Sequence, residues 1–332
     1  MRNGVGMMET SGFAKYSIKG RGAKAFLDRM LACRIPLAGK MTLAPMLKED
    51  GKLIGDFTLA TFSDVEFLLI GSGIAENYHM RWFEQHLPAD GSVTFEAVNL
   101  GLTGLAIAGP KARDLLAKLT HLDLSTEAFP FMAIRKMTVG LAPAIVGRVS
   151  YTGDLGYEIW MKPEYQRHIF DKLMEAGREF GLRMFGLRAL NSLRLEKGYG
   201  SWAREYRPLY GPFEAELGRV IALKKEADFI GKAAAAREKI EGGTLRLRTF
   251  IVDAREADVM GDEPIWHKGE VKGWVTSGGY AHAPGLSVAI GYVPKEIADQ
   301  PDGWQVELLG DMLDARLQVE PLFDANGGIM RG

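Results

Sequence analysis

Apolar residues in the first two thirds of the chain recur with two alternating periods, one typical of strands and one typical of helices. Residues 13–18 read as a strand, and in residues 23–31 apolar side chains recur at i, i+3, i+4, i+7 and i+8, the stripe of an amphipathic helix. Further strands are predicted at residues 53–60, 66–70, 93–97, 101–108, 144–151 and 157–161. Further helices are predicted at residues 74–86, after Gly109-Pro110, at 165–180 with Gly181 as its cap, and at 187–195. The pattern predicts mixed helix and strand structure here.

The helical period disappears after about Thr244, and the remaining residues alternate in the way that strands do. Alternation is clear at residues 245–249, 304–308 and 313–319, with glycine and proline turns between. Short strands in this arrangement predict a small barrel or sandwich. Because Glu241-Gly242-Gly243 resembles a linker, we place the boundary there, with one domain at residues 1–240 and a C-terminal β-barrel domain at 241–332.

Length and charge narrow the class of protein. The chain has 332 residues, enough for two or three packed units, and its 41 Lys and Arg against 42 Asp and Glu give a net charge of −1. This balance argues against a large attraction to nucleic acid or to an anionic membrane. No apolar run approaches the ~20 residues of a membrane span, and the N-terminus lacks a signal peptide. We therefore expect a cytoplasmic enzyme.

Several kinds of site are disfavoured by the residues present. The single cysteine, Cys33, excludes an internal disulfide and a multi-cysteine metal site, and the histidines show no metal-ligand spacing, so we expect no metal. Gly71-Ser72-Gly73 is not a complete dinucleotide fingerprint, and no Walker A sequence occurs. We expect that the chain does not bind NAD or FAD by itself.

Four charged residues are candidates for a site. Asp56 lies inside an apolar strand, where an unpaired charge is costly, so it is either a functional acid or a carboxylate hydrogen-bonded to backbone or water. Glu158 follows the glycine-containing loop 151–156. It is either a partner for a ligand edge that carries two parallel N–H groups, as guanidine does, or a surface residue of a hairpin. Arg194 and Glu196 cannot share a helix face, so one of them points toward an interface or a site.

Six stretches, in the same order, resemble the aminomethyltransferase family, to which the glycine cleavage T-protein belongs. They are residues 51–56, 109–113, 129–132, 151–158, 192–198 and 273–278. Ser11-Gly12-Phe13-Ala14-Lys15-Tyr16 and residues 55–58 and 227–232 are more similar to the folate domain of dimethylglycine and sarcosine dehydrogenases than to T-proteins. T-proteins also carry an arginine at the place of Leu190 and a tyrosine near that of Leu68.

This resemblance implies a fold, a cofactor and a reaction. The fold would be a three-lobed α+β clover-leaf with a C-terminal barrel, and the cofactor would be tetrahydrofolate. Asp56 matches the catalytic acid and Glu158 the pterin-binding carboxylate; Tyr151 and Arg194 are expected to contribute to cofactor binding. The donor would be an iminium derived from an N-methyl amine, or a formaldehyde equivalent, and the product 5,10-methylenetetrahydrofolate. An FAD-binding dehydrogenase subunit or domain is the expected partner.

Three other functions stay open within the same resemblance. One is a glycine cleavage T-protein, and a second is a folate-dependent O- or S-demethylase. The third is a non-catalytic iron–sulfur assembly factor, which is disfavoured because Lys197-Gly198-Tyr199 lacks the cysteine of that group. Because the resemblance starts at residue 1, we expect a piece or partner of a longer flavoprotein, with exposed apolar surface around Val5, Met7, Met8 and Phe13.

Overall fold

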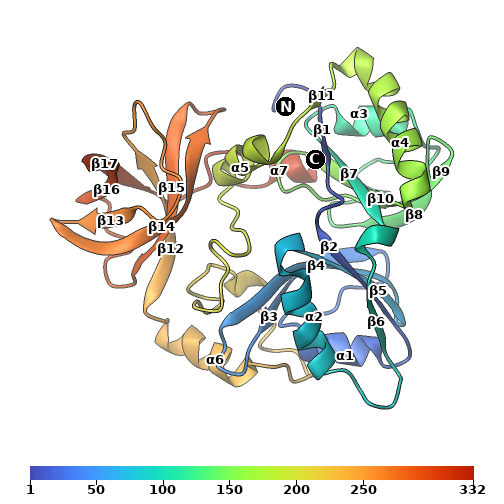
Figure 1. The fold of residues 1–332 in the computed structure, drawn as a ribbon, viewed down its shortest axis with the longest axis horizontal. Helices are drawn as coiled ribbons and strands as arrows, with labels where there is room; N and C mark the ends of the chain where they lie inside the picture. Colours follow the sequence, from blue (N-terminus) through green and yellow to red (C-terminus); the bar gives the residue numbers. More distant parts are fainter.

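Three lobes arranged around the middle of the molecule make up the computed structural model, which describes residues 1–332 (Figure 1). Two lobes combine a β-sheet with helices, and the third is a closed β-barrel. This arrangement confirms the predicted α+β clover-leaf with a C-terminal barrel. No helix combines the length and the apolar character that crossing a bilayer requires.

The first lobe is a five-stranded sheet in the order β3-β4-β5-β2-β6, with two α-helices packed on it. Its elements are β2 (Ala14–Lys19), α1 (Ala23–Met30), β3 (Lys40–Leu47), β4 (Leu53–Ser63), β5 (Glu66–Gly71), η1 (Gly73–Ala75), α2 (Glu76–Gln85), β6 (Thr94–Ala97) and η2 (Asn99–Gly101). The apolar stripe predicted for residues 23–31 is buried on α1, so the period identified this helix correctly. Strands β4 and β5 form the hairpin expected at 53–70.

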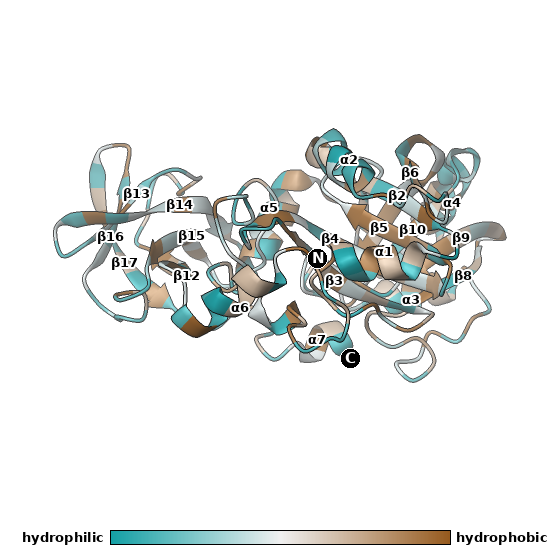
Figure 2. Cartoon of the chain, turned by 90° about the horizontal axis from the view of Figure 1, so that it is seen from below, coloured by the Kyte–Doolittle hydropathy of each residue, from teal (hydrophilic) through white to brown (hydrophobic).

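The second lobe is a six-stranded sheet in the order β11-β1-β7-β10-β9-β8. Its elements are β1 (Gly6–Glu9), β7 (Thr103–Ala108), α3 (Ala112–Ala117), β8 (Ile134–Val139), β9 (Ala142–Gly147), β10 (Gly156–Met161), α4 (Pro163–Ala176), η3 (Gly177–Phe180) and β11 (Arg183–Met184). Figure 2 shows hydrophobic residues along β5 and β10, in the interior of the two sheet lobes. Six buried residues from the two sheets also pack against each other and join the lobes: Met41, Ala60, Leu68, Ile70, Ile134 and Trp160.

The barrel closes in the strand order β12-β15-β14-β13-β16-β17. Its strands are β12 (Leu245–Val252), β13 (Pro264–His267), β14 (Glu270–Ala281), β15 (Leu286–Pro294), β16 (Trp304–Leu308) and β17 (Asp311–Gln318). The connection from the second lobe contains α5 (Leu187–Glu196), η4 (Gly218–Val220) and α6 (Lys232–Glu241), and it crosses the middle of the molecule (Figure 1). After the barrel, α7 (Gly328–Arg331) lies back against the second lobe, where Arg148 donates to Arg331 O at 2.7 Å.

The expectation of exposed apolar surface near the N-terminus is wrong. Val5, Met7 and Met8 are 2%, 0% and 6% exposed, and Phe13 is half-buried. The reason is that β1 is an interior strand of the second sheet, paired with β11 on one side and β7 on the other. Both of its faces are covered, so consecutive apolar residues are the normal pattern there rather than a sign of a missing partner.

Candidate functional site

Asp56 lies in β4, near the point where the sheet of the first lobe ends. The pairing of β4 with β5 begins at Thr58, so the neighbouring strand does not reach Asp56 on that side. On the other side Asp56 faces Pro45 of the edge strand β3, a position that suits a residue without an N–H. Gly55 is required next to it, because a Cβ there would lie 2.4 Å from the ring of Phe57. The local sequence therefore buries Phe57 and presents Asp56 on the opposite face of the strand.

The carboxyl group of Asp56 is poorly solvated and incompletely hydrogen-bonded. The residue is half-buried, and its Oδ1 atom is inaccessible to water and has no hydrogen-bond partner in the protein. Loss of water raises its pKa to about 7; an N–H of its own backbone opposes this rise, and the charge of nearby Glu205 adds to it. A carboxyl group with this pKa exchanges protons near neutral pH, as a general acid or base must.

Two tyrosines belong to the same cluster as Asp56. Burial raises the pKa of Tyr151 and of Tyr206, and the charge of Asp56 contributes to both shifts. Tyr151 donates its hydroxyl hydrogen to Gly200 O at 2.6 Å and stacks on Tyr199 with ring centroids 5.9 Å apart. These contacts fix the ring of Tyr151 in place.

Arg194 of α5 pairs with a carboxylate that the sequence did not reveal. Its Nη1 atom lies 3.1 Å from Oε2 of Glu205, and both side chains are almost completely buried. Glu205 also accepts hydrogen bonds from the backbone N–H of Ser201 at 2.8 Å and from the hydroxyl of Thr276, in β14, at 2.6 Å. The pair therefore joins the central connection to the barrel, immediately beside Asp56.

Glu158 faces a narrow, mostly apolar pocket in the second lobe. The pocket is lined by Met8, Thr10, Phe13, Ala106, Ile107, Ala108, Val149, Ser150, Tyr151, Thr152, Glu158, Phe185 and Leu190. Burial raises the pKa of Glu158 to about 7, and the positive charge of Lys15 opposes this rise. Oγ1 of Thr10 is buried there without a partner. Two unsatisfied polar groups within apolar walls suit a flat heteroaromatic ligand with N–H groups along one edge.

The pocket beside Glu158 is smaller than such a ligand. Its free volume is about 30 Å³, room for about two water molecules. A flat bicyclic ligand is larger than this volume, so it would fit only if the side chains of the walls moved apart, a common adjustment on binding. Met8, Phe13, Phe185 and Leu190 are among the large apolar side chains of these walls.

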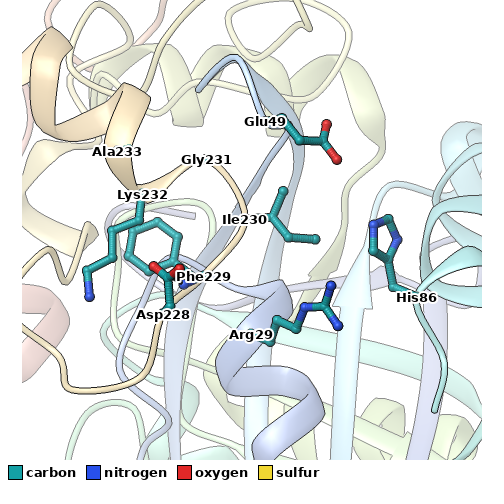
Figure 3. Close-up of a pocket in the computed structure, with 9 residues that line it drawn as sticks. All are labelled: Arg29, Glu49, His86, Asp228, Phe229, Ile230, Gly231, Lys232 and Ala233. Carbon is teal, nitrogen blue, oxygen red and sulfur yellow. Dashed lines mark hydrogen bonds between the residues drawn. The ribbon is translucent and has the colours of Figure 1, made fainter.

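A wider pocket of about 310 Å³ lies elsewhere, between the first lobe and the segment that leads into α6 (Figure 3). It is lined by Arg29, Glu49, His86, Asp228, Phe229, Ile230, Gly231, Lys232 and Ala233. Its charged side chains have mixed sign and are largely exposed, and none of the predicted site residues lines it. Size alone therefore does not make it the better candidate.

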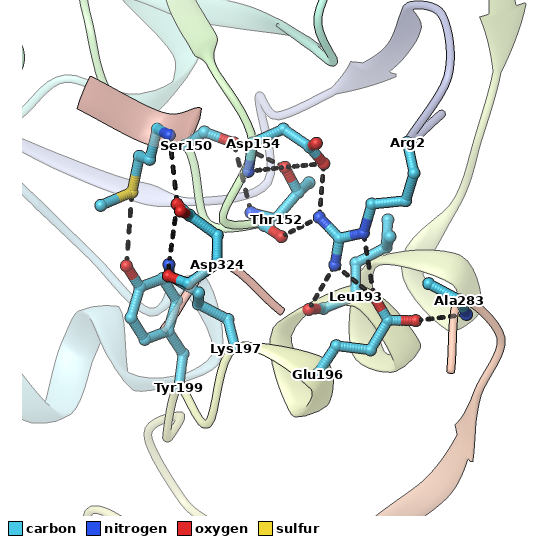
Figure 4. Close-up of polar contacts among 11 residues, drawn as sticks. Arg2, Ser150, Thr152, Asp154, Leu193, Glu196, Lys197, Tyr199, Ala283 and Asp324 are labelled. Carbon is cyan, nitrogen blue, oxygen red and sulfur yellow. Dashed lines mark hydrogen bonds and ion pairs between the residues drawn. The ribbon is translucent and has the colours of Figure 1, made fainter. Parts of the chain in front are cut away.

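A buried polar junction joins the N-terminal segment to α5 and to the C-terminal segment (Figure 4). Arg2 contacts Oδ2 of Asp154 at 2.5 Å, forms an ion pair with Glu196 and lies over the ring of Phe323. In the same region Lys197 contacts Oδ2 of Asp324 at 3.2 Å. The loop 151–156, which carries Tyr151, is thereby tied to α5, so these ion pairs set the position of one wall of the pocket.

The four predicted site residues occupy two connected places. Asp56, Tyr151 and Arg194 gather around Glu205, and Tyr151 also lines the pocket that contains Glu158. Arg194 does not line that pocket, and its guanidinium contacts are within the protein. The structure holds no group of three or more His, Cys, Asp or Glu placed to bind a metal. Glu205 and Lys15 were missed because neither stands out from its neighbours in the sequence.

Comparison with known proteins identifies the family. The chain matches the GCVT N-terminal domain over residues 1–225 and the glycine cleavage T-protein C-terminal barrel domain over residues 246–324. It is 30% identical over 328 residues to an aminomethyltransferase of Chloroherpeton thalassium, covering 98% of this chain and 89% of that protein. The chain belongs to the aminomethyltransferase family of the glycine cleavage T-protein.

Two further similarities, one in sequence and one in structure, relate the chain to known proteins. The chain is 38% identical to the mitochondrial dimethylglycine dehydrogenase of Mus musculus over 96% of its own residues, but spans only 37% of that enzyme. In structure it resembles the glycine cleavage system aminomethyltransferase T from Bartonella henselae, with a TM-score of 0.87 at 23% identity, covering 98% of this chain and 88% of that one. The latter similarity establishes the fold.

Proposed function

We propose that the chain binds tetrahydrofolate and catalyses transfer of a methylene group to it, giving 5,10-methylenetetrahydrofolate. The donor would be an iminium derived from an N-methyl amine, or a formaldehyde equivalent. The protein would act as the folate module of a dimethylglycine or sarcosine dehydrogenase-like system, with an FAD-binding subunit or domain as its partner. The 38% identity to a dimethylglycine dehydrogenase over almost the whole chain supports this choice of system.

The observation that carries the proposal is the state of Asp56. Its Oδ1 atom is buried without a partner and its pKa is about 7, so it is equipped to take up a proton or to hold a positive charge. Tetrahydrofolate supplies the nitrogen atoms that receive the one-carbon unit. Asp56 would accept the proton that the attacking nitrogen loses, and in its ionised form it would stabilise the positive charge of the donor.

The remaining site residues would bind and orient the acceptor. Glu158 has no hydrogen-bond or ion-pair partner within the protein, so both carboxylate oxygens can accept parallel N–H groups from a pterin edge. Tyr151 lines the pocket of Glu158 and is close enough to Asp56 for the charge of Asp56 to act on it, so it would position the acceptor between them. Arg194 would act indirectly, by holding Glu205 beside Asp56.

Calorimetry with tetrahydrofolate under anaerobic conditions, followed by a formaldehyde-trapping assay, tests this function. We expect binding by the protein alone and accelerated formation of methylenetetrahydrofolate from formaldehyde. With a flavin-bearing N-methyl amine dehydrogenase present, free formaldehyde should fall as the folate product rises. A protein that does not bind reduced folate would refute the proposal.

A second candidate is the aminomethyltransferase step of glycine cleavage. It is favoured by the alignment with an aminomethyltransferase over 89% of that protein, which shows that a chain of this size corresponds to nearly the whole relative. A lipoylated carrier protein bearing the aminomethyl group discriminates the two. Release of ammonia from this donor, with no response to a flavoprotein, would favour the glycine cleavage reaction.

A further inference from the structure

Lys15 is a buried cation that the proposed reaction does not use. It lies in β2 and is 0% exposed, although burying an ammonium group is costly and lysine is almost never fully buried unless it is paired. Its Nζ atom donates hydrogen bonds to Ser11 O at 2.9 Å and to Phe13 O at 2.7 Å. Carbonyl oxygens satisfy these donors but do not cancel the charge, so compensation of the ammonium depends on carboxylates nearby.

The two hydrogen bonds of Lys15 hold the loop between β1 and β2. This loop passes from the second sheet to the first, and its residues Thr10 and Phe13 line the pocket that contains Glu158. Lys15 therefore fixes one wall of the pocket from behind. It does not line the pocket itself, so it is placed to act on the ligand only through its neighbours.

The charges around Lys15 come from three elements. The carboxylates of Glu9 in β1, Glu158 in β10 and Glu76 at the start of α2 stabilise the ammonium, while loss of water lowers its pKa. Glu9 is exposed and accepts a hydrogen bond from the backbone N–H of Ser11 at 2.7 Å. The interaction between Lys15 and Glu158 is mutual, and Lys15 is the charged group that opposes the rise in the pKa of Glu158.

We propose that Lys15 is a positioning residue of this pocket: its ammonium fixes the β1–β2 loop and supplies the positive charge that favours the ionised form of Glu158. Resting on the proposed function, this assigns to Lys15 control of the pH range in which folate binds. Only an ionised Glu158 accepts two N–H groups from one ligand edge. Without the positive charge, the pKa of Glu158 would rise further, so that at neutral pH most of the carboxyl group would be protonated and would lose one of these acceptors.

The test separates the charge of Lys15 from its structural contacts. Lys15→Gln retains an N–H donor for the loop carbonyls and removes the charge, whereas Lys15→Met removes both. Lys19→Met is the matched control, because Lys19 is an exposed residue of the same strand. Dissociation constants for tetrahydrofolate are measured by anaerobic calorimetry of the full chain between pH 6 and pH 9.

In the unsubstituted protein, affinity should fall on the acid side of a midpoint near pH 7. In Lys15→Gln and Lys15→Met the midpoint should move upward by about one pH unit, the size of effect that a nearby opposite charge exerts. At pH 7 the dissociation constant should then rise about fivefold, since the ionised fraction of Glu158 falls from about one half to about one tenth when its pKa rises by one unit. Lys19→Met should follow the unsubstituted protein at every pH.

A purely structural role predicts a different result. Loss of the loop contacts alone would weaken binding by the same factor at every pH and leave the midpoint in place, and that outcome would overturn the assignment. In a Glu158→Gln background, Lys15→Gln should no longer change the pH dependence; a persisting shift would place the titrating group elsewhere.

A ligand-free measurement keeps this inference separable from the proposed function. Carbon-13 NMR of labelled glutamate carboxyl groups, with Glu158 assigned by its loss in Glu158→Gln, should show its pKa rising in Lys15→Gln. If the unsubstituted protein binds no folate, the proposed function fails while this titration still tests the coupling. If folate binds and neither the NMR titration nor the binding midpoint moves, the Lys15 inference fails alone.

Discussion

Asp56→Asn should slow methylene transfer and, at the same time, stabilise the protein at alkaline pH. The amide is nearly the same size as the carboxyl group but cannot ionise, so the variant removes proton transfer and charge without removing volume. Losing one positioned acid–base group costs about 10²–10⁴ in rate. Folate affinity should change little, because Glu158 and the pocket walls are untouched.

The stability effect follows from the pKa of Asp56. Burial raises this pKa to about 7 from an unfolded-state value of about 3.9, a shift of roughly three units. At about 1.4 kcal/mol per unit, ionised Asp56 destabilises the folded protein by at most about 4 kcal/mol. This destabilisation of the folded protein is absent below pH 4, grows as the pH rises and is complete above pH 7. A buried amide N–H without a partner costs about 1–3 kcal/mol at every pH, so it cancels when two pH values are compared.

Thermal unfolding of both proteins at pH 4 and pH 8 provides the measurement. The stability of Asp56→Asn relative to the unsubstituted protein should increase between these pH values by an amount approaching 4 kcal/mol. Asp311→Asn, an exposed aspartate in β17, is the control for general effects of charge and should show no such increase. A difference that stays constant with pH would refute the raised pKa. An unchanged transfer rate would refute the catalytic assignment, whatever the stability shows.

Three further substitutions test other parts of the site. Glu158→Ala should raise the dissociation constant for tetrahydrofolate by roughly ten- to a hundredfold, measured by calorimetry, because a charge-assisted contact of about 1.5–3 kcal/mol is lost. Arg2→Met should destabilise the protein by several kcal/mol and more strongly at pH 8 than at pH 4.5, measured by thermal unfolding, because it leaves two buried carboxylates unpaired. Glu205→Gln should cost about 3–5 kcal/mol by leaving Arg194 unpaired, and it should move the acid limb of the rate profile to lower pH, because the negative charge that raises the pKa of Asp56 is gone.

The sequence predicted those elements whose two faces differ in polarity. The helix at 23–30 buries one face and the strand at 304–308 buries alternate residues, and the apolar periods of both are clear. Strand β1 and the barrel strand β15 were not recognised as strands. Both are buried on both faces, as the consecutive buried residues of β15 show, so no alternation marks them. The apolar period of a segment depends on whether each of its two faces is buried or exposed. It does not identify the elements that pack against those faces.

The residues of the candidate site divide in the same way, into those that the sequence identifies and those that it does not. Asp56 could be predicted because a charged group in an apolar strand breaks a local rule, and such breaks concentrate at functional positions. Glu205 could not, because it lies in an irregular loop where a carboxylate is unremarkable. Its importance depends on Thr276, which is 71 residues away in the sequence. In the sequence, Lys15 cannot be distinguished from any other lysine of a strand, because the second sheet that covers it comes from other parts of the chain.

The site lies where the three lobes meet, and the buried ion pairs explain why it can be maintained there. Asp56 comes from the first lobe, Glu158 from the second, and the barrel reaches the cluster through the bond of Thr276 to Glu205. Buried ion pairs gain little net free energy, since desolvation offsets the attraction, but breaking one is costly. Their contribution here is therefore geometric: the pairs of Arg194 and Arg2 penalise any displacement of α5 relative to Glu205 and to the loop of Tyr151. The proposed roles of Asp56 and Glu158, which lie on separate sheets and would act on one ligand, require that this displacement be suppressed.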